Sequence, residues 1–298
     1  MAKITTEMIK ELREKTQVGM MECKKALTES DGNIEKAIEL LRKKGAAVAA
    51  KRADKATNNG HIESNISDDL KSGVLLKTNC ETDFSAKTID MKDFSKRICK
   101  HIITTHPECA HDDALCLLEQ KLFDDEKIKI NDLLNELIAK IGEKIKVEEF
   151  VSFKIDGNGL VDSYIHPGAN LGVLIAISTD KELEGSNQQS LKQLAHDVCM
   201  QIAVTNPISI DPDGIPTEIL EKEFSIIKAQ LAASNKPKNL IEKISQGKLN
   251  KYYEEVCLLS QKFIKDDKIT IQKQIEKIEK ETGLKIKIEN FSRLSVGK

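Results

Sequence analysis

The chain has 298 residues, with 46 basic and 48 acidic side chains, a net charge of −2 and no Trp. This length predicts about two domains with room for a substantial core. The balanced charge argues against a general attraction to nucleic acid and favours a protein partner. No apolar run is long enough to span a membrane.

The cysteines and the N-terminal residues indicate where the protein works. Seven cysteines are scattered without a disulfide framework, which is typical of a reducing compartment. The first residues lead directly into a helical pattern with Glu7 and Glu11, unlike a secretory or transit peptide. We therefore expect a cytoplasmic protein with no membrane segment.

The first 45 residues predict three short helices. Apolar residues recur at helical spacing, and turn signals stand at Gly19 and at Asp31–Asn33. A bundle of this size is marginally stable alone, so we interpret residues 1–45 as a docking module. Residues 46–57, rich in Ala and Lys, are either a linker or a solvated helix.

The remainder of the chain is a duplication. Asn59-Gly60, Ser64 and Gly73-Val74-Leu75 recur 99 residues later, and Cys99 recurs as Cys199. Ile128 then matches Ile269, with the register kept through the C-terminal strand. Each copy predicts the order strand, strand, helix, helix, strand, an α+β unit with helices on one face of a small antiparallel sheet.

The offset between the copies rises from 100 to 141, so the second copy carries about 41 additional residues. These residues show helical apolar spacing on both sides of a turn at Ser234–Pro237, which predicts a projecting helical hairpin. Its wide apolar stripe suggests a partner surface. We expect a first unit at 58–156 and a second unit at 157–298, with the arm at about 217–262.

The segment Asn79–Phe84 follows the apolar run Val74–Leu76, which predicts a buried strand ending in a polar turn at Lys77–Asn79. A Phe beside an Asp on a turn could be a local core anchor, which is the usual fate of an aromatic side chain. It could also enter a pocket of another protein. This segment has no counterpart in the second copy.

The string Asn79–Phe84 resembles the signature of the translation elongation factor Ts family, the nucleotide-exchange factors of elongation factor Tu. Three further stretches are similar to the same family and occur in the family's order along the chain. They are Val18–Leu27, Ser163–Gly168 and Gly247–Tyr253 together with Glu255–Leu258.

The resemblance implies a protein that binds elongation factor Tu, GDP-bound or nucleotide-free, and promotes exchange of GDP for GTP. It implies that a turn of Thr82, Asp83, Phe84 and Ser85 enters the partner's nucleotide domain and displaces its Mg²⁺. It also implies a set of partner contacts and, in some members, a homodimer through the arm. These contacts are Arg13, Met20, Met21, Lys24, Ile141, Gly142 and His166.

Several of these residues have other readings. Ser85 stands where the family usually has an apolar residue, which we expect to remove apolar surface beside Phe84. Met20 and Met21 could be helix core rather than an adaptable interface. His166 could be only a turn residue before Pro167-Gly168.

Catalytic and cofactor motifs give little support to an enzyme. The chain has no phosphate-binding loop, and no acid, base and nucleophile converge. Cys80 lacks a neighbouring His base, so a structural role is favoured over a nucleophile. One set of residues invites a metal reading, but its spacing does not match a zinc site: Cys99, His101, His106, Cys109, His111 and Cys116.

We therefore predict no cofactor, no metal and no direct nucleic-acid contact. Two alternative functions stay open. One is a non-catalytic binding or scaffolding protein for a translation GTPase. The other is an RNA- or ribosome-associated factor, which the basic residues Lys51, Arg52 and Lys55 would support.

Overall fold

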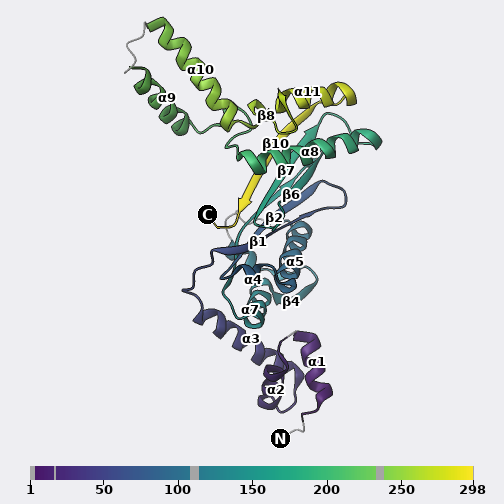
Figure 1. The fold of residues 1–298 in the computed structure, drawn as a ribbon. Helices are drawn as coiled ribbons and strands as arrows, with labels where there is room; N and C mark the ends of the chain where they lie inside the picture. The colour runs from purple at the N-terminus through teal and green to yellow at the C-terminus, as the bar shows by residue number, and fades with distance from the viewer. Residues whose placement is uncertain (1–3, 17, 108–113, 233–237, 298) are drawn as a thin grey trace.

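The computed structural model describes residues 4–16, 18–107, 114–232 and 238–297. It combines helices with small antiparallel sheets, which confirms the predicted α+β class. Figure 1 shows an elongated molecule with its larger sheets in the middle, the N-terminal helices at one end and a helical hairpin projecting from the other end.

The first three helices are α1 (Thr6–Thr16), α2 (Met20–Glu29) and α3 (Ile34–Lys51). Asn33 ends the turn before α3, and its Oδ1 accepts a hydrogen bond from the backbone N of Lys36 at 3.0 Å. The three helices share a small core of their own. It contains Leu12, Cys23, Ala26, Leu27, Ala37 and Leu41.

Helix α3 continues across the expected boundary at residue 45 and connects this bundle to the first unit. It packs on α7 (Ile130–Ile141), where a side chain at Gly45 would place its Cβ 2.9 Å from the carbonyl oxygen of Asn135. Arg42 Nε lies 3.2 Å from Glu136 Oε1 across the same contact. Glycine at position 45 therefore permits close approach of the two helices.

The first unit has a three-stranded antiparallel sheet in the order β1-β2-β5. Its strands are β1 (Asn59–Ile66), β2 (Ser72–Cys80) and β5 (Ile145–Lys154). Its other helices are α4 (Asp83–Ala86), α5 (Ile89–Thr105) and α6 (Ala114–Leu118). Helices α5 and α7 enclose the larger core of this unit against one face of the sheet.

The second unit has a sheet in the order β10-β7-β6. Its strands are β6 (Gly159–Ile165), β7 (Leu171–Thr179) and β10 (Ile286–Ser295). Helices α8 (Gly185–Thr205) and α11 (Ile271–Thr282) cover one face of it. The three strands of each large sheet and the two helices that cover it therefore follow one another in the same order in both units.

The two sheets pack against each other through their remaining faces, with a shared core that includes Leu75 and Leu174. Two pairs of equivalent residues lie at this interface. Ser163 Oγ lies 3.0 Å from Ser64 Oγ, and these two residues are 99 positions apart in the sequence. Gly73 and Gly172 both face side chains of the opposite sheet.

Substituting Gly172 by Ala should destabilise the protein by about 1–3 kcal/mol, because the new methyl group overpacks the interface. Its Cβ would lie 2.7 Å from Ile62 Cγ2 and 2.8 Å from Leu75 Cδ1. Urea denaturation measures the change. Gly157→Ala is the matched control, since a Cβ there meets nothing within 4 Å. Equal unfolding midpoints for the two variants would contradict this account of the interface.

The prediction is wrong on two details of the strands, namely where the second strand ends and which short strands occur. Strand β2 does not end at a polar turn of Lys77–Asn79 but continues to Cys80, with all nine of its residues buried. Two of its polar side chains have partners: Thr78 Oγ1 lies 3.3 Å from Ser95 Oγ, and Asn79 Nδ2 donates to Glu148 Oε2 at 3.5 Å. Asn79 Oδ1 finds none among the described residues. Each unit also contains a short hairpin that the prediction missed. These hairpins are β3 (Lys121–Leu122) with β4 (Asp125–Lys129), and β8 (Lys262–Phe263) with β9 (Asp266–Thr270).

The additional residues of the second unit form α9 (Thr217–Ala232) and α10 (Lys238–Val256), flanked by two 3₁₀ turns. The turns are η1 (Pro212–Gly214) and η2 (Leu258–Ser260). The two ends of this segment lie side by side, since Ile208 N donates to Val256 O at 3.0 Å and Leu258 N donates to Ser209 O at 2.9 Å. We call α9 and α10 the arm (Figure 1).

Candidate functional site

The most exposed aromatic side chain of the described residues lies on α4, directly after β2. Thr82 caps this helix, with its Oγ1 accepting a hydrogen bond from Ser85 N at 3.3 Å. Phe84 is 80% exposed, so it is not the local core anchor that its residue type alone would favour. We call Thr82–Ser85 the finger.

The base of the finger is held from several sides. Glu143 accepts two hydrogen bonds from Thr82, at 3.0 Å from the backbone N and at 2.7 Å from Oγ1. Cys80 Sγ donates to the carbonyl oxygen of Thr82 at 3.1 Å. Asn59 Nδ2 donates to the carbonyl oxygen of Glu81 at 2.8 Å. The exposed ring therefore stands on a fixed support.

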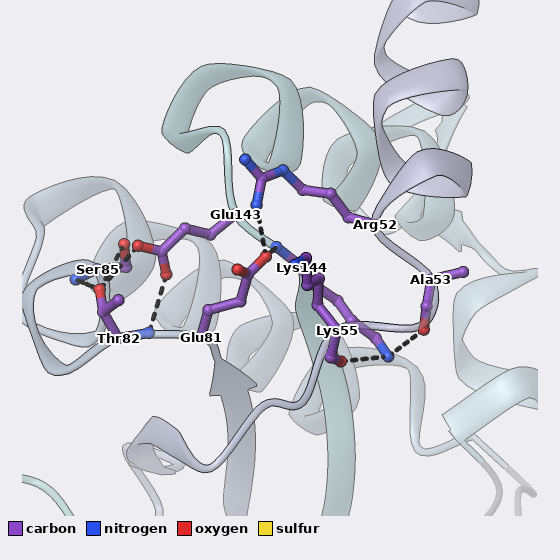
Figure 2. A network of polar contacts seen from close by, with 8 residues as sticks. All are labelled: Arg52, Ala53, Lys55, Glu81, Thr82, Ser85, Glu143 and Lys144. Atoms are coloured by element: carbon purple, nitrogen blue, oxygen red, sulfur yellow. Dashed lines mark hydrogen bonds and ion pairs between the residues drawn. The ribbon is translucent and has the colours of Figure 1, made fainter.

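A second set of polar contacts joins this support to the end of α3, as Figure 2 shows. Glu81 Oε1 accepts from Lys144 N at 2.6 Å and from Arg52 Nη1 at 2.8 Å. The Lys144 backbone N–H and the Arg52 guanidinium lower the pKa of the Glu81 carboxyl. Lys144 Nζ donates to the carbonyl oxygen of Lys55 at 2.9 Å. The N-terminal bundle and the finger are thus connected through residues 52–55, 81 and 144.

The charged residue of the finger is paired at the surface. Asp83 Oδ2 lies 2.8 Å from Lys87 Nζ, one helical turn away, and both side chains are exposed. The Lys87 ammonium lowers the pKa of the Asp83 carboxyl, so Asp83 is ionised at neutral pH. An exposed pair of this kind contributes little to stability and can exchange partners readily.

Ser85 does not lie on the surface beside Phe84, so the expectation that it removes apolar surface there is wrong. Only 5% of Ser85 is exposed. Its backbone N donates to Thr82 Oγ1, and its carbonyl oxygen accepts from Thr88 Oγ1 at 2.8 Å. The first turn of α4 directs Phe84 outward and the next residue inward, and this gives Ser85 a packing role.

The four candidate contacts of the N-terminal bundle are all exposed: Arg13, Met20, Met21 and Lys24. Met20 and Met21 open α2 directly after Gly19, with 45% and 66% of their surfaces exposed. Neither belongs to the core of the bundle. The structure therefore contradicts the alternative in which Met20 and Met21 are part of the helix core.

The remaining candidates lie on the two units. Ile141 ends α7 against the first core, and Gly142 follows it with a φ of 79°, directly before Glu143. His166 is exposed at the turn between β6 and β7, with its Nδ1 3.1 Å from Tyr164 Oη. Ala169 of the same turn accepts from Ile62 N at 2.8 Å, so this turn is fixed against the first unit.

The cysteine and metal candidates receive structural explanations. Burial and the nearby Glu143 carboxylate raise the pKa of Cys80 to about 11, which is unfavourable for a thiolate nucleophile. Cys99 is fully buried, with its Sγ 3.8 Å from the carbonyl oxygen of Glu63. His101 lies 2.9 Å from Gln120 Oε1. Within the described parts of the chain, no three potential ligands are placed to hold a metal ion.

Cys109 and His111 lie outside the described residues, while His106 ends α5. Cys116 is disulfide-bonded, which departs from the expectation of reduced thiols throughout. The five free cysteines of the described residues are all buried: Cys23, Cys80, Cys99, Cys199 and Cys257.

Sequence reasoning missed Glu143, Lys144 and Arg52 as parts of the site. Glu143 directly follows the candidate Ile141-Gly142, which was the available signal. Its contact with Thr82 joins residues 61 positions apart, and a sequence pattern carries no information on such a pairing.

No helix in the described parts of the chain is long and apolar enough to cross a membrane.

Comparisons with known proteins place the chain in one family. The family profile described as elongation factor TS matches residues 81–298. Elongation factor Ts of Clostridium botulinum type A (strain ATCC 19397) is 40% identical over 294 residues, which is 99% of this chain and 92% of that protein. The protein of the same name from C. botulinum type E3 (strain Alaska E43) is also 40% identical, over 99% of this chain and 93% of its own length. The chain belongs to the elongation factor Ts family of translation factors.

Proposed function

We propose that this protein binds elongation factor Tu in its GDP form, accelerates GDP release and so allows exchange for GTP. The observation that carries the proposal is the finger, a single turn of helix that presents Phe84 to solvent from a fixed base. An aromatic side chain held outside its own core gains free energy only when a partner buries it.

The physical basis is a coupling between two binding events. GDP, its Mg²⁺ and the surrounding loops of a GTPase stabilise one another, so GDP leaves slowly. A protein that binds only the distorted site weakens GDP binding by the same factor by which GDP weakens its own binding. Insertion of Phe84 would distort that site, and Asp83 would disturb the metal-linked loop. Thr82 and Ser85 would hold the turn in shape.

Burial of one Phe side chain contributes about 1.5–3 kcal/mol, so the finger needs a wider interface to act. We propose Arg13, Met20, Met21 and Lys24 as contacts that dock the N-terminal bundle. Further contacts would come from Ile141 and Gly142 and from His166. The exposure of Arg13, Met20, Met21, Lys24 and His166, and for the bundle the adaptability of methionine, supports their assignment. Ile141 and Gly142 are half-buried, and their place directly before Glu143 of the finger's support is the reason to include them.

In this proposal residues 1–45 dock, 46–57 connect, and the units at 58–156 and 157–298 form the scaffold. The protein would act in the cytoplasm as an exchange factor rather than an enzyme, without a cofactor, a metal of its own or direct contact with nucleic acid. The net charge of −2 supports a protein partner over RNA.

The test is release of fluorescently labelled GDP from purified elongation factor Tu, measured by stopped flow with and without this protein. A release rate that rises with protein concentration to a plateau supports the proposal. Tight binding without faster release would instead identify a non-catalytic scaffolding protein. If the protein neither binds elongation factor Tu nor accelerates GDP release, both candidate functions are excluded.

We also propose that the arm forms a homodimer. Three of its described apolar side chains, Ile219, Phe224 and Ile226, are exposed on α9. Because residues 208–210 bond to residues 256–259 at the base of the arm, a Gly-Ser linker can replace residues 217–255 and leave these bonds in place. The variant should sediment as a monomer and keep the melting temperature of the scaffold. If sedimentation gives the same number of chains per particle for the variant and for wild type, the arm dimer is contradicted.

A further inference from the structure

The side chain of Glu143 determines how Thr82 can act as the cap of α4. A threonine hydroxyl has one hydrogen atom, and here it is donated to Glu143 Oε1 at 2.7 Å. The hydroxyl lone pairs are therefore left for Ser85 N–H, at 3.3 Å. Glu143 Oε2 fixes the backbone of the same residue by accepting from Thr82 N at 3.0 Å (Figure 2).

The duplicated units separate this contact from the general scaffold. In the first unit Glu81 accepts from Lys144 N at 2.6 Å, and in the second unit Asp180 accepts from Lys285 N at 2.7 Å. This turn-to-strand bond thus occurs in both copies. Position 143 differs, because its equivalent in the second unit is the buried Leu284, and the described residues 180–184 between β7 and α8 contain no helix like α4. The carboxylate occurs in the copy that has the finger.

We propose that Glu143 is a positioning residue that holds the finger in its partner-ready geometry. Phe84 is 80% exposed and has little packing of its own, so its direction depends on the base of α4. A side chain that must enter a pocket binds better when its position is fixed beforehand, since less conformational entropy is lost. This inference rests on the proposed exchange function, and it assigns to Glu143 no contact with the partner.

The first test compares wild type, Glu143→Gln and Glu143→Ala in GDP release over a range of protein concentrations. Loss of two charge-assisted hydrogen bonds should lower the plateau rate of Glu143→Ala by about tenfold. The half-saturating concentration should change by less than about threefold, because the docking surface is intact. Glu143→Gln keeps one acceptor oxygen and should lie between the two. Asp180→Ala, which removes the carboxylate that accepts from Lys285 N in the second unit, far from the finger, is the control and should equal wild type.

The second readout is amide hydrogen exchange in the unbound protein, which needs no partner. Amides of Ser85 and Ala86 should exchange about tenfold faster in Glu143→Ala than in wild type, while those of β7 stay unchanged. A third comparison uses Thr82→Val. Glu143→Ala should lower the plateau rate of GDP release by a smaller factor in the Thr82→Val variant than in wild type, because the two residues act through one contact.

The outcomes distinguish the two proposals. If wild type does not accelerate GDP release, the proposed function fails, and the amide exchange result still decides whether Glu143 holds the finger. If wild type accelerates release and Glu143→Ala has the same plateau and the same Ser85 exchange, the positioning role is wrong. The positioning role is also wrong if Glu143→Ala lowers the plateau rate by the same factor in wild type and in the Thr82→Val variant.

Discussion

Replacement of Phe84 by Ala should lower the plateau rate of GDP release from elongation factor Tu by about ten- to a hundredfold. The reason is that burial of a Phe side chain is worth about 1.5–3 kcal/mol, and each 1.4 kcal/mol corresponds to a factor of ten. The loss falls on the step in which the ring enters the partner. Binding through other surfaces remains.

The same substitution should leave the free energy of unfolding within about 0.5 kcal/mol of wild type, because the ring is already exposed. Leu115→Ala is a suitable control, since Leu115 is a comparably exposed apolar residue of the same unit outside the finger. Stopped-flow release and urea denaturation are measured on the same preparations. An unchanged plateau rate for Phe84→Ala, or a loss of equal size for Leu115→Ala, would count against the role proposed for Phe84 in the exchange step.

The structure explains why the finger could be only partly predicted. Residue type alone favours a buried Phe, and only the longer string Asn79–Phe84 pointed to a partner-facing role. The sequence also predicted a turn, because it could not show that Thr82 finds an acceptor in Glu143 and so caps a helix. Ser85 was misplaced for the same reason. In a helical turn, consecutive residues point about 100° apart, so Phe84 and Ser85 face opposite surroundings.

The duplication was predictable because repeated register survives in the sequence, whereas the contacts between copies were not. Offsets identified Ser64 with Ser163, but nothing in the pattern indicated that their hydroxyl groups lie 3.0 Å apart between two packed sheets. The end of β2 was misjudged because polar residues usually mark a turn. Here Thr78 and Asn79 are buried with polar neighbours, since β1 and β5 flank them on both sides.

The N-terminal bundle should affect the exchange reaction in a different way from the finger. In the double variant Met20→Ala/Met21→Ala, we expect the half-saturating concentration to rise by about ten- to a hundredfold with the plateau rate unchanged. The two side chains are exposed at the start of α2, and their burial by a partner would be lost. Loss of binding that is equal in the ground and activated states changes half-saturation alone.

Concentration series of GDP release separate the two parameters for this variant. The bundle should stay folded, because its core of Leu12, Cys23 and Leu27 does not include either methionine, and circular dichroism checks this. Val204→Ala controls for loss of exposed aliphatic surface elsewhere, at the end of α8. A lower plateau with unchanged half-saturation would assign the methionines to the exchange step. If both parameters matched wild type, α2 would not be a docking surface, and the finger would require its wider interface from the two units alone.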